Sequence, residues 1–413
     1  MTPNELFAQA LPLGRPWKVI ESGFEGNPKR LMIEVGLEEG ATRLACPECG
    51  ELCPIHDRME RRWKHLNFWQ YETELSARVP RVKCDQCGVH LVEVPWARPG
   101  SGFTLLFEAM TLLLVGQMPV SEAARMVCEH DTRLWRIIRH YVDKAHAQSD
   151  WSDVKRVGVD ETSRRKGHRY VTNFVDLDSG RLLYMTEGKD AATVEAFVSQ
   201  LACHQSRAEN IKEVAMDMSR AFQSGVEAHL PKAAKVFDRY HVMVLAGEAL
   251  DAVRKEVARE AGGLEKGALW SLRGNVERLS EEKAAQRERL CRQHGKLGRA
   301  MALKEFLADT WKYSDRDQGE EHLEAVVSWA ARCRMEPFKK LARTLRSHWE
   351  GILNYYRHWT TSAVIEAING KLQLARRRAR GYRNIENFRA IAYWIAGDLR
   401  PDAGLPNPIP QPF

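Results

Sequence analysis

Two aspartates stand where they could share metal ions. Asp160 ends the apolar stretch VKRVGVD, and Asp217 ends IKEVAMD. If these stretches form parallel neighbouring strands, both carboxylates lie at the sheet edge where α/β proteins bind ligands. Two such acids repel each other unless a cation lies between them, although an acid at the end of a single strand is commonplace. Glu161 adjoins Asp160 but, by strand alternation, is expected to point away from it.

A third carboxylate, Glu366, lies near the start of a helix predicted for residues 362–380. At 3.6 residues per turn, the predicted buried stripe consists of Thr361, Ile365, Ile368, Leu372 and Ala375. After Glu366 the helix carries a series of cations that could hold DNA phosphates: Lys371, Arg376, Arg377, Arg378 and Arg380. An ordinary solvated helix is the alternative, but a single acid among so many bases argues against it.

Four cysteines form two CxxC pairs, which are Cys46 with Cys49 and Cys84 with Cys87. CxxC turns aim two thiolates at one tetrahedral ion, so the two pairs predict a closed structural zinc site. A redox pair would need a βαβ setting and would occur once. Other side chains close enough to replace one ligand are Cys53, His56, His65 and His90, of which Cys53 is expected to pack within the module. Basic and aromatic residues surround the pairs, a mixture suited to phosphate contacts or to a solvated face.

Residues 103–147 have the pattern of three short helices, the last two of which resemble a helix-turn-helix. Ser121 could cap the first of these two, and Asp131 or Thr132 the second. The second helix would present Arg133, Arg136 and Arg139 to the DNA major groove. Any small helical bundle shows similar spacing, but the position after a basic zinc module favours DNA binding.

The two aspartates lie in a region that alternates strands and helices. After Trp151 the expected order is β-β-β-α-β-α-β-α, with a hairpin turn at Asp178-Ser179-Gly180. Residues 261–355 contain no convincing strand and are rich in Leu, Ala, Glu, Lys, Arg and Trp at helical spacing. They are therefore expected to form an all-helical block inserted before the helix of Glu366.

Composition limits the class of protein. A chain of 413 residues exceeds the size that one core serves, so about two to four domains are expected. The apolar fraction of 44% and the charged fraction of 28% argue against a disordered or membrane protein. The start of the chain lacks the pattern of a signal peptide, which predicts a cytoplasmic protein with reduced cysteines. The net charge of +7 agrees with a polyanionic partner without proving one.

Five motifs together resemble one family, the bacterial insertion-sequence transposases of the ISL-three family. They are CPEC with CDQC, VGVDETSRRKGHRY, VAMDMSRAF, FDRYHVM and TTSAVIEAINGKLQLARRRARGYRNIENFR. The resemblance implies a DDE nuclease of ribonuclease H-like fold, with Asp160, Asp217 and Glu366 as its catalytic acids. It also implies that Asp238 and His241 support the site without replacing an acid. The chain departs from the family at two positions, Ser362 and Ala367, where members often have Asn and Gly.

The predicted fold class is multidomain. Its parts are an N-terminal lead (1–40), a zinc-binding β-rich module (41–97), a helix-turn-helix DNA-binding domain (100–148), a ribonuclease H-like α/β catalytic domain in two parts (152–260 and 356–398), an all-helical insertion (261–355) and a flexible tail (399–413).

The resemblance further implies a reaction. Two Mg²⁺ or Mn²⁺ ions held by the three acids would serve cleavage at the ends of a mobile element and joining of the 3′-hydroxyl to target DNA. The expected partner is double-stranded DNA, both transposon ends and target, in a bacterial cytoplasm. Because two ends must be brought together, a homodimer or larger assembly is expected. Two rivals remain, a DNA-binding regulator with an inactive nuclease domain and a junction-cutting nuclease.

Overall fold

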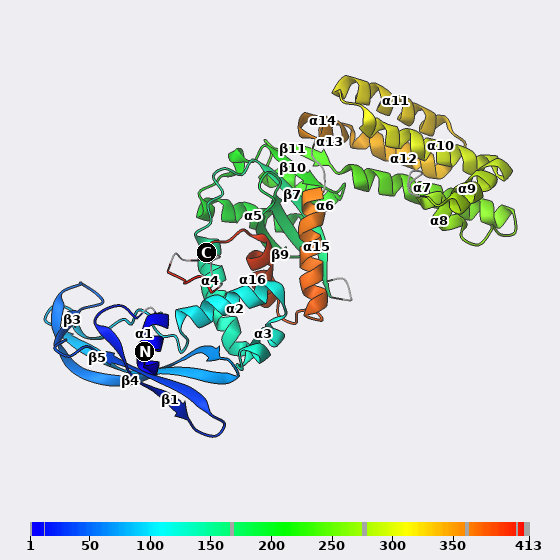
Figure 1. Cartoon of the computed structure of the whole chain (residues 1–413). Coiled ribbons are helices and arrows are strands. Elements are labelled where there is room, and N and C mark those ends of the chain that lie inside the picture. The colour runs from blue at the N-terminus through cyan, green and yellow to red at the C-terminus, as the bar shows by residue number, and fades with distance from the viewer. Residues whose placement is uncertain are drawn as a thin grey trace. The chain divides into compact units, whose positions relative to one another are not determined.

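The computed structural model describes residues 2–11, 13–165, 169–274, 279–359, 363–401 and 404–408. The chain forms two compact units (Figure 1). Unit 1 comprises Met1–His146, Ala375–Ile395 and Leu399–Phe413, and unit 2 comprises Ala147–Leu374 and Ala396–Asp398. Among the described residues, no helix has the length and apolar character needed to span a membrane.

Unit 1 begins with a six-stranded sheet in the order β1-β2-β5-β4-β3, with β6 paired to β5. Its elements are α1 (Pro3–Ala10), β1 (Trp17–Glu25), β2 (Arg30–Leu37), β3 (Arg43–Ala45), β4 (Leu52–Phe68), β5 (Tyr71–Cys84) and β6 (Gly88–Leu91). The segment 1–40, treated from sequence as a lead, thus supplies two strands to the sheet of the zinc module. The physical reason is the alternation of Leu31, Ile33 and Val35, which bury against Trp63 and Leu75 in one core.

The rest of unit 1 is helical, and the three predicted helices are confirmed. They are α2 (Leu105–Gln117), α3 (Val120–Met126) and α4 (Asp131–Ala147), joined by α16 (Ile385–Ala396) from the end of the chain. Thr104 caps α2 by accepting a hydrogen bond from the Phe107 N–H. The cap predicted at Ser121 is wrong, because Pro119 occupies the N-cap position of α3 and Ser121 lies inside the helix. Trp394 on α16 donates to the Leu112 carbonyl on α2 at 2.8 Å.

A buried ionic network fixes the linker between the sheet and these helices. Glu108 on α2 is fully buried and accepts two hydrogen bonds from Arg98 Nε, each 3.0 Å long. It also accepts from the Ser101 hydroxyl at 2.7 Å and from the Tyr141 hydroxyl at 2.6 Å. Burial raises the pKa of Tyr141, and the hydrogen bond from its hydroxyl to Glu108 raises it further. One carboxylate therefore joins the linker to α2 and α4.

Replacing this carboxylate should loosen the helical part of unit 1. Glu108→Ala leaves the half-buried Arg98 guanidinium and two hydroxyls without their acceptor, which costs about 3 kcal/mol. We expect this loss of stability to appear as reduced hydrogen-exchange protection of the backbone amides in α2 and α4. Glu122→Ala, which removes an exposed ion pair with Arg125, is the control and should change protection by no more than about 0.5 kcal/mol. Equal effects of the two variants would contradict the role of the network.

Unit 2 is built on a five-stranded sheet in the order β11-β10-β7-β8-β9. The strands are β7 (Arg156–Arg165), β8 (Arg169–Asp176), β9 (Leu182–Glu187), β10 (Glu213–Met216) and β11 (Ala234–Phe237). The first three pair antiparallel, while β10 pairs in parallel with β7 and with β11. Three helices complete the region: α5 (Ala191–Leu201), α6 (Arg220–His229) and α7 (Arg239–Glu260). The predicted order β-β-β-α-β-α-β-α is confirmed.

Beyond β11, α7 runs into a bundle of further helices (Figure 1). These are α8 (Ala268–Arg273), α9 (Glu281–Gln293), α10 (Gly295–Asp309), α11 (Arg316–Arg332), α12 (Glu336–Ser347), α13 (Trp349–Leu353) and α14 (Tyr355–His358). The described part of segment 261–355 holds no strand. The bundle contacts the sheet at β11, where the Asn354 side chain donates a hydrogen bond to the Lys235 carbonyl at 2.9 Å. A Cβ at Gly351 would lie 2.3 Å from the Phe237 ring, so only glycine lets α13 pack this closely.

Candidate active site

The register of the sheet places Asp160 beside Asp217. Strands β7 and β10 are parallel neighbours, as predicted, with Ala215 opposite Gly158. Continued by two residues, the same register brings Asp217 level with Asp160. The prediction that Asp160 ends its strand is wrong. Strand β7 continues to Arg165 because it pairs with β8, in which Asn173 lies opposite Asp160.

Glu366 comes from α15 (Ala363–Arg378), and a glycine on β7 lets this helix approach the sheet. A Cβ on Gly158 would lie 2.5 Å from Ile365 Cδ1 and 2.8 Å from Leu177 Cδ2. The predicted buried stripe is confirmed at Ile365, Ile368 and Leu372, whereas Ala375 is half-buried and Thr361 lies outside the described residues. Because Ile365 packs on β7, the next residue, Glu366, reaches the edge that carries the two aspartates.

Gly158→Ala should therefore impair the site without touching an acid. The added methyl overlaps Ile365, which costs about 1–3 kcal/mol of stability and displaces the start of α15. A shift of about 1 Å at a catalytic group can slow a reaction about 10²-fold, so we expect a loss of that order in the single-turnover rate of the reaction at this site. Adding Ile365→Ala removes the opposing side chain and should restore part of the rate. Wild-type stability and rate in Gly158→Ala would show that this close approach does not position Glu366.

The three acids line one cavity of about 290 Å³. Asp238, Tyr240 and His241, from the start of α7, line it as well. Asp238 caps α7 by accepting from the Tyr240 N–H at 3.0 Å, and its second oxygen lies 3.2 Å from His241 Nδ1. The structure therefore brings together all five residues that the sequence analysis assigned to this site. It adds Tyr240, which is 58% exposed at the same cavity.

Carboxylate repulsion shapes the electrostatics of this cavity. Burial raises the pKa of Asp160, and repulsion from Asp217 and Asp238 acts in the same direction, against the Glu161 N–H bond and the His241 charge. The Asp238 carboxylate, 3.2 Å from Nδ1, raises the pKa of His241, and the charges of Asp160 and Asp217 add to this effect. The cavity thus favours positive charge inside it.

Backbone groups hold the two aspartates in place. Asp160 Oδ1 accepts from the Glu161 N–H at 2.7 Å, and Asp217 Oδ1 accepts from the Ser219 N–H at 2.9 Å. The sequence analysis missed Asn369, whose side chain donates to Asp160 Oδ2 at 2.6 Å. Its position one turn after Glu366 on the same helix was the available signal.

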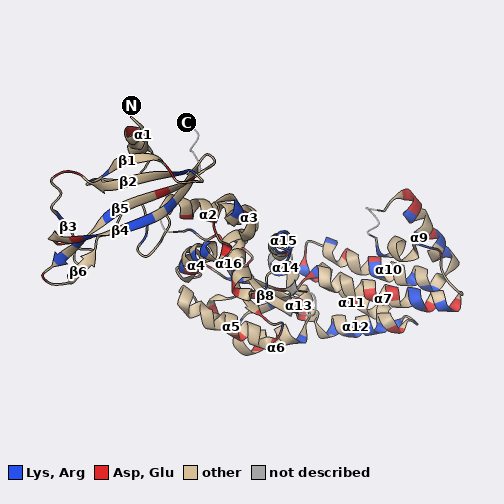
Figure 2. Cartoon of the chain, turned by 90° about the horizontal axis from the view of Figure 1, so that it is seen from below, with Lys and Arg blue, Asp and Glu red and all other residues tan. Residues whose placement is uncertain are grey.

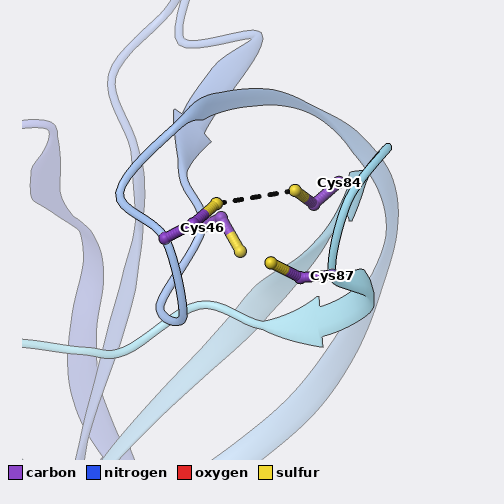
Figure 3. A group of neighbouring side chains, drawn as sticks. Cys46, Cys84 and Cys87 are labelled. Carbon is purple, nitrogen blue, oxygen red and sulfur yellow. Dashed lines mark hydrogen bonds between the residues drawn. The ribbon is translucent and has the colours of Figure 1, made fainter.

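The four paired cysteines converge in unit 1 (Figure 3). Their sulfur atoms all lie within 4.8 Å of one another, and Cys49 Sγ is 3.6 Å from Cys84 Sγ. Each pair is followed by a glycine with positive φ, Gly50 at 77° and Gly88 at 91°, which turns the chain back into a strand. Backbone N–H groups lower the pKa of Cys84 to about 6. Four sulfur ligands at this spacing fit a tetrahedral structural zinc ion.

The alternative zinc ligands make other contacts. Cys53 packs in a small core with Leu44 and Val82, as expected. His65 Nδ1 lies 2.8 Å from the Thr104 hydroxyl, and His90 Nε2 lies 2.6 Å from the Cys87 carbonyl. Burial lowers the pKa of His65 to about 4, so this imidazole is neutral. Among the described residues, only the four paired cysteines cluster at metal-binding distance.

The arginines predicted on α4 differ in their surroundings. Arg133 pairs with Glu129 at 2.7 Å and lies over the Phe103 ring at 4.3 Å. Arg139 donates to Asn387 at 2.6 Å. Arg136 is exposed, and among the described residues it has no ion-pair partner. The opposite side of α4 is buried, since its buried residues include Leu134, Ile137, Ile138 and Tyr141.

Basic side chains also gather at the end of α15, as Figure 2 shows in blue. Lys371, Arg377 and Arg380 are exposed, and Arg376 is half-buried. Arg378 donates to the Gln117 carbonyl at the end of α2 at 2.8 Å. The helix ends where the Gly381 N–H bonds to the Arg376 carbonyl at 2.8 Å, with Gly381 at a φ of 94°.

Family models match three successive regions of the chain. Residues 43–87 match the "zinc-finger of transposase IS204/IS1001/IS1096/IS1165", and residues 92–142 match the "Helix-turn-helix domain of transposase family ISL3". Residues 157–392, more than half of the chain, match the ISL3 family model described as "Transposase". A zinc ribbon and a helix-turn-helix joined to this unit define a DNA-binding protein of the transposase class.

Two relatives extend the match along the chain. The chain is 30% identical over 410 residues to the "Transposase for insertion sequence element IS1557" of Mycobacterium tuberculosis, covering 91% of this chain and 90% of the relative. It is 28% identical over 371 residues to the "Transposase for insertion sequence element IS1001" of Bordetella parapertussis, covering 86% and 89%. This chain belongs to the ISL3 (ISL-three) family of transposases.

Proposed function

We propose that the chain is a DDE transposase that binds the terminal inverted repeats of an insertion sequence, cleaves at the element's ends and joins the 3′-hydroxyl to target DNA. The observation that carries this proposal is the cavity shared by Asp160, Asp217 and Glu366. A regulator that only binds DNA has no need of three carboxylates in one cavity, where they repel one another. Membership of the ISL3 family supports the same reaction.

We further propose a ribonuclease H-like catalytic domain in two parts, residues 152–260 and 356–398, with 261–355 as a helical insertion. In support, three antiparallel strands continue into two parallel ones, with Asp160 inside β7 and Asp217 directly after the neighbouring strand β10. The bundle contacts the sheet near β11, which suits an insertion between α7 and α15. The zinc module and the helix-turn-helix domain then form the DNA-binding part.

The donor set of the cavity fits divalent magnesium or manganese. Carboxylate oxygens are the ligands these hard cations prefer. Burial raises the pKa of Asp160, and repulsion from Asp217 and Asp238, which a cation would relieve, adds to this effect. Bound there, such ions activate a nucleophilic oxygen and stabilise the leaving oxygen.

The residues of the chain have distinct roles in this proposal. Asp160 and Asp217 are held by backbone N–H groups, so each presents a fixed carboxylate to the cavity. Glu366 closes the site from α15. Asp238 lies 3.2 Å from His241 Nδ1 and raises the pKa of His241, which favours the protonated imidazole beside the acids, where a DNA phosphate would lie. The walls formed by Val159 and Ile365 exclude water from one side of the reacting phosphate.

The DNA partners follow from the basic residues. We propose that Arg133, Arg136 and Arg139 on α4 contact the transposon ends and that the cations of α15 hold DNA phosphates. Contact with DNA would exchange the present partners of Arg133 and Arg139 for phosphates or bases. Assembly as a homodimer or larger complex, and a cytoplasmic setting that keeps the zinc thiolates reduced, belong to the same proposal.

A joining assay separates this proposal from its rivals. The protein is given donor duplexes with the element's own ends and free 3′-hydroxyls, together with a target plasmid. A transposase joins donor to plasmid, a junction-cutting nuclease cuts branched DNA without joining, and a regulator binds the ends unchanged. End binding by zinc-loaded protein without any joined product would overturn the proposal.

A further inference from the structure

The side chain of Asn369 joins α15 to three side chains of the sheet. Its Nδ2 donates to Asp160 Oδ2 at 2.6 Å. Its Oδ1 accepts from the Thr162 hydroxyl at 2.8 Å and from Asn173 Nδ2 at 2.9 Å. The sheet residues share one face, because Asn173 lies opposite Asp160 in the β7–β8 pairing and Thr162 follows Asp160 by two positions.

Burial and the chemistry of the partners fix the orientation of this amide. Thr162 is 2% exposed and Asn173 is fully buried, so their polar atoms depend on partners inside the protein. An ionised carboxylate only accepts hydrogen bonds, and Asn173 Nδ2 only donates. Asn369 must therefore turn Nδ2 toward Asp160 and Oδ1 toward the other two, since a flipped amide would lose these bonds.

We propose that Asn369 is a positioning residue that orients Asp160 and sets the register of Glu366 against β7. The inference rests on the proposed function of the three acids. Each Asp160 oxygen accepts one N–H, from Glu161 and from Asn369, which locks the carboxylate rotamer. Each oxygen keeps lone-pair capacity for a cation. The Ile365–Gly158 contact sets how closely α15 approaches β7, and Asn369 sets where along β7 the helix sits.

The test measures metal affinity apart from catalysis. In Asn369→Ala, Mn²⁺ binding to the full chain without DNA, followed by the electron paramagnetic resonance signal of free Mn²⁺, should weaken about 10- to 100-fold. The Mn²⁺ concentration for half-maximal end cleavage should rise by a similar factor, while end binding stays unchanged. Gln373→Ala, one turn further along α15, is the matched control and should behave as wild type.

A second pair of variants keeps the test decisive if Asn369→Ala folds poorly. Thr162→Val removes a hydroxyl that holds the far side of the amide and keeps the shape of the side chain. It should raise the required Mn²⁺ concentration several-fold, and Thr162→Ser should not. Unchanged Mn²⁺ dependence in both Asn369→Ala and Thr162→Val would overturn the inference, even if the melting temperatures of the variants fall. That combination would show that Asn369 only docks α15 on the sheet and does not orient Asp160.

Asp160→Asn distinguishes failure of this inference from failure of the proposed function. Wild-type Mn²⁺ binding and cleavage in Asp160→Asn would overturn the metal site itself, and the role of Asn369 with it. If Asp160→Asn loses both while Asn369→Ala keeps wild-type Mn²⁺ affinity, only the positioning role is overturned.

Discussion

Replacing Asp160, Asp217 or Glu366 by its neutral amide should abolish both cleavage and joining while leaving end binding intact. Each change removes a proposed cation ligand but preserves the size of the side chain and most of its hydrogen bonding. Metal-ion stabilisation of a phosphoryl transition state amounts to several kcal/mol, so each variant should lose on the order of 10³-fold or more in rate. Cleavage at the 3′ end and strand transfer would be measured beside a binding assay.

Glu161→Gln is the matched control for these variants. Glu161 adjoins Asp160 on β7, and strand alternation directs its side chain to the opposite face of the sheet. It should keep wild-type cleavage, although the pKa of Glu161 is raised by burial and by Asp217. Full activity in Glu366→Gln would overturn the third ligand, and Glu350, now paired with Arg316, would become the next candidate.

Loss of the zinc site should have the second large effect. Cys84→Ser removes one of four thiolates that surround a single point, and it also opens the small core that contains Cys53 and Val82. Binding of structural zinc amounts to about 10–16 kcal/mol in isolated finger peptides, far more than a small β-rich module can lose and stay folded. We expect the module to unfold and specific end binding to disappear.

Zinc content by atomic spectroscopy and end binding by gel shift measure this effect. Wild-type protein should carry one zinc ion per chain. Cys203→Ser, which changes an exposed cysteine outside the cluster, should retain both zinc and binding. Well-folded wild-type protein without zinc, or specific end binding by zinc-free Cys84→Ser, would refute the assignment.

The features that sequence predicted best depend on local pattern. Alternation and turn residues gave the order of strands and helices in unit 2, and CxxC spacing gave the cysteine cluster. The aspartates could be paired because each follows a short apolar run in the sequence, and these runs lie in β7 and β10, which are parallel neighbours in the sheet. Helical periodicity identified Ile365, Ile368 and Leu372 as the buried side of α15.

The features that sequence missed depend on contacts between distant segments. Strand β2 pairs in parallel with β5. The sheet position of the first 40 residues therefore depends on a strand later in the chain and could not be predicted from their own pattern. Asn369 resembles any polar residue on a surface helix until its bonds to Asp160 and Asn173 are seen. Glu108 resembles an ordinary acid on a helix surface in the sequence, yet its carboxylate accepts hydrogen bonds from the linker and from α4. Local periodicity carries no information about such long-range hydrogen bonds.

The most direct test of the three-acid site is the full reaction on one DNA duplex. Zinc-loaded wild-type protein is incubated with a duplex carrying the element's own end and a target plasmid, with Mg²⁺, Mn²⁺, Ca²⁺ or no added divalent cation. We predict end cleavage followed by joining with Mg²⁺ or Mn²⁺, and bound but uncut DNA with Ca²⁺ or no added cation, because Ca²⁺ coordinates more loosely. Cleavage that proceeds equally without an added cation, or ends that the protein binds but never cuts with any metal, would contradict a metal site at the three acids.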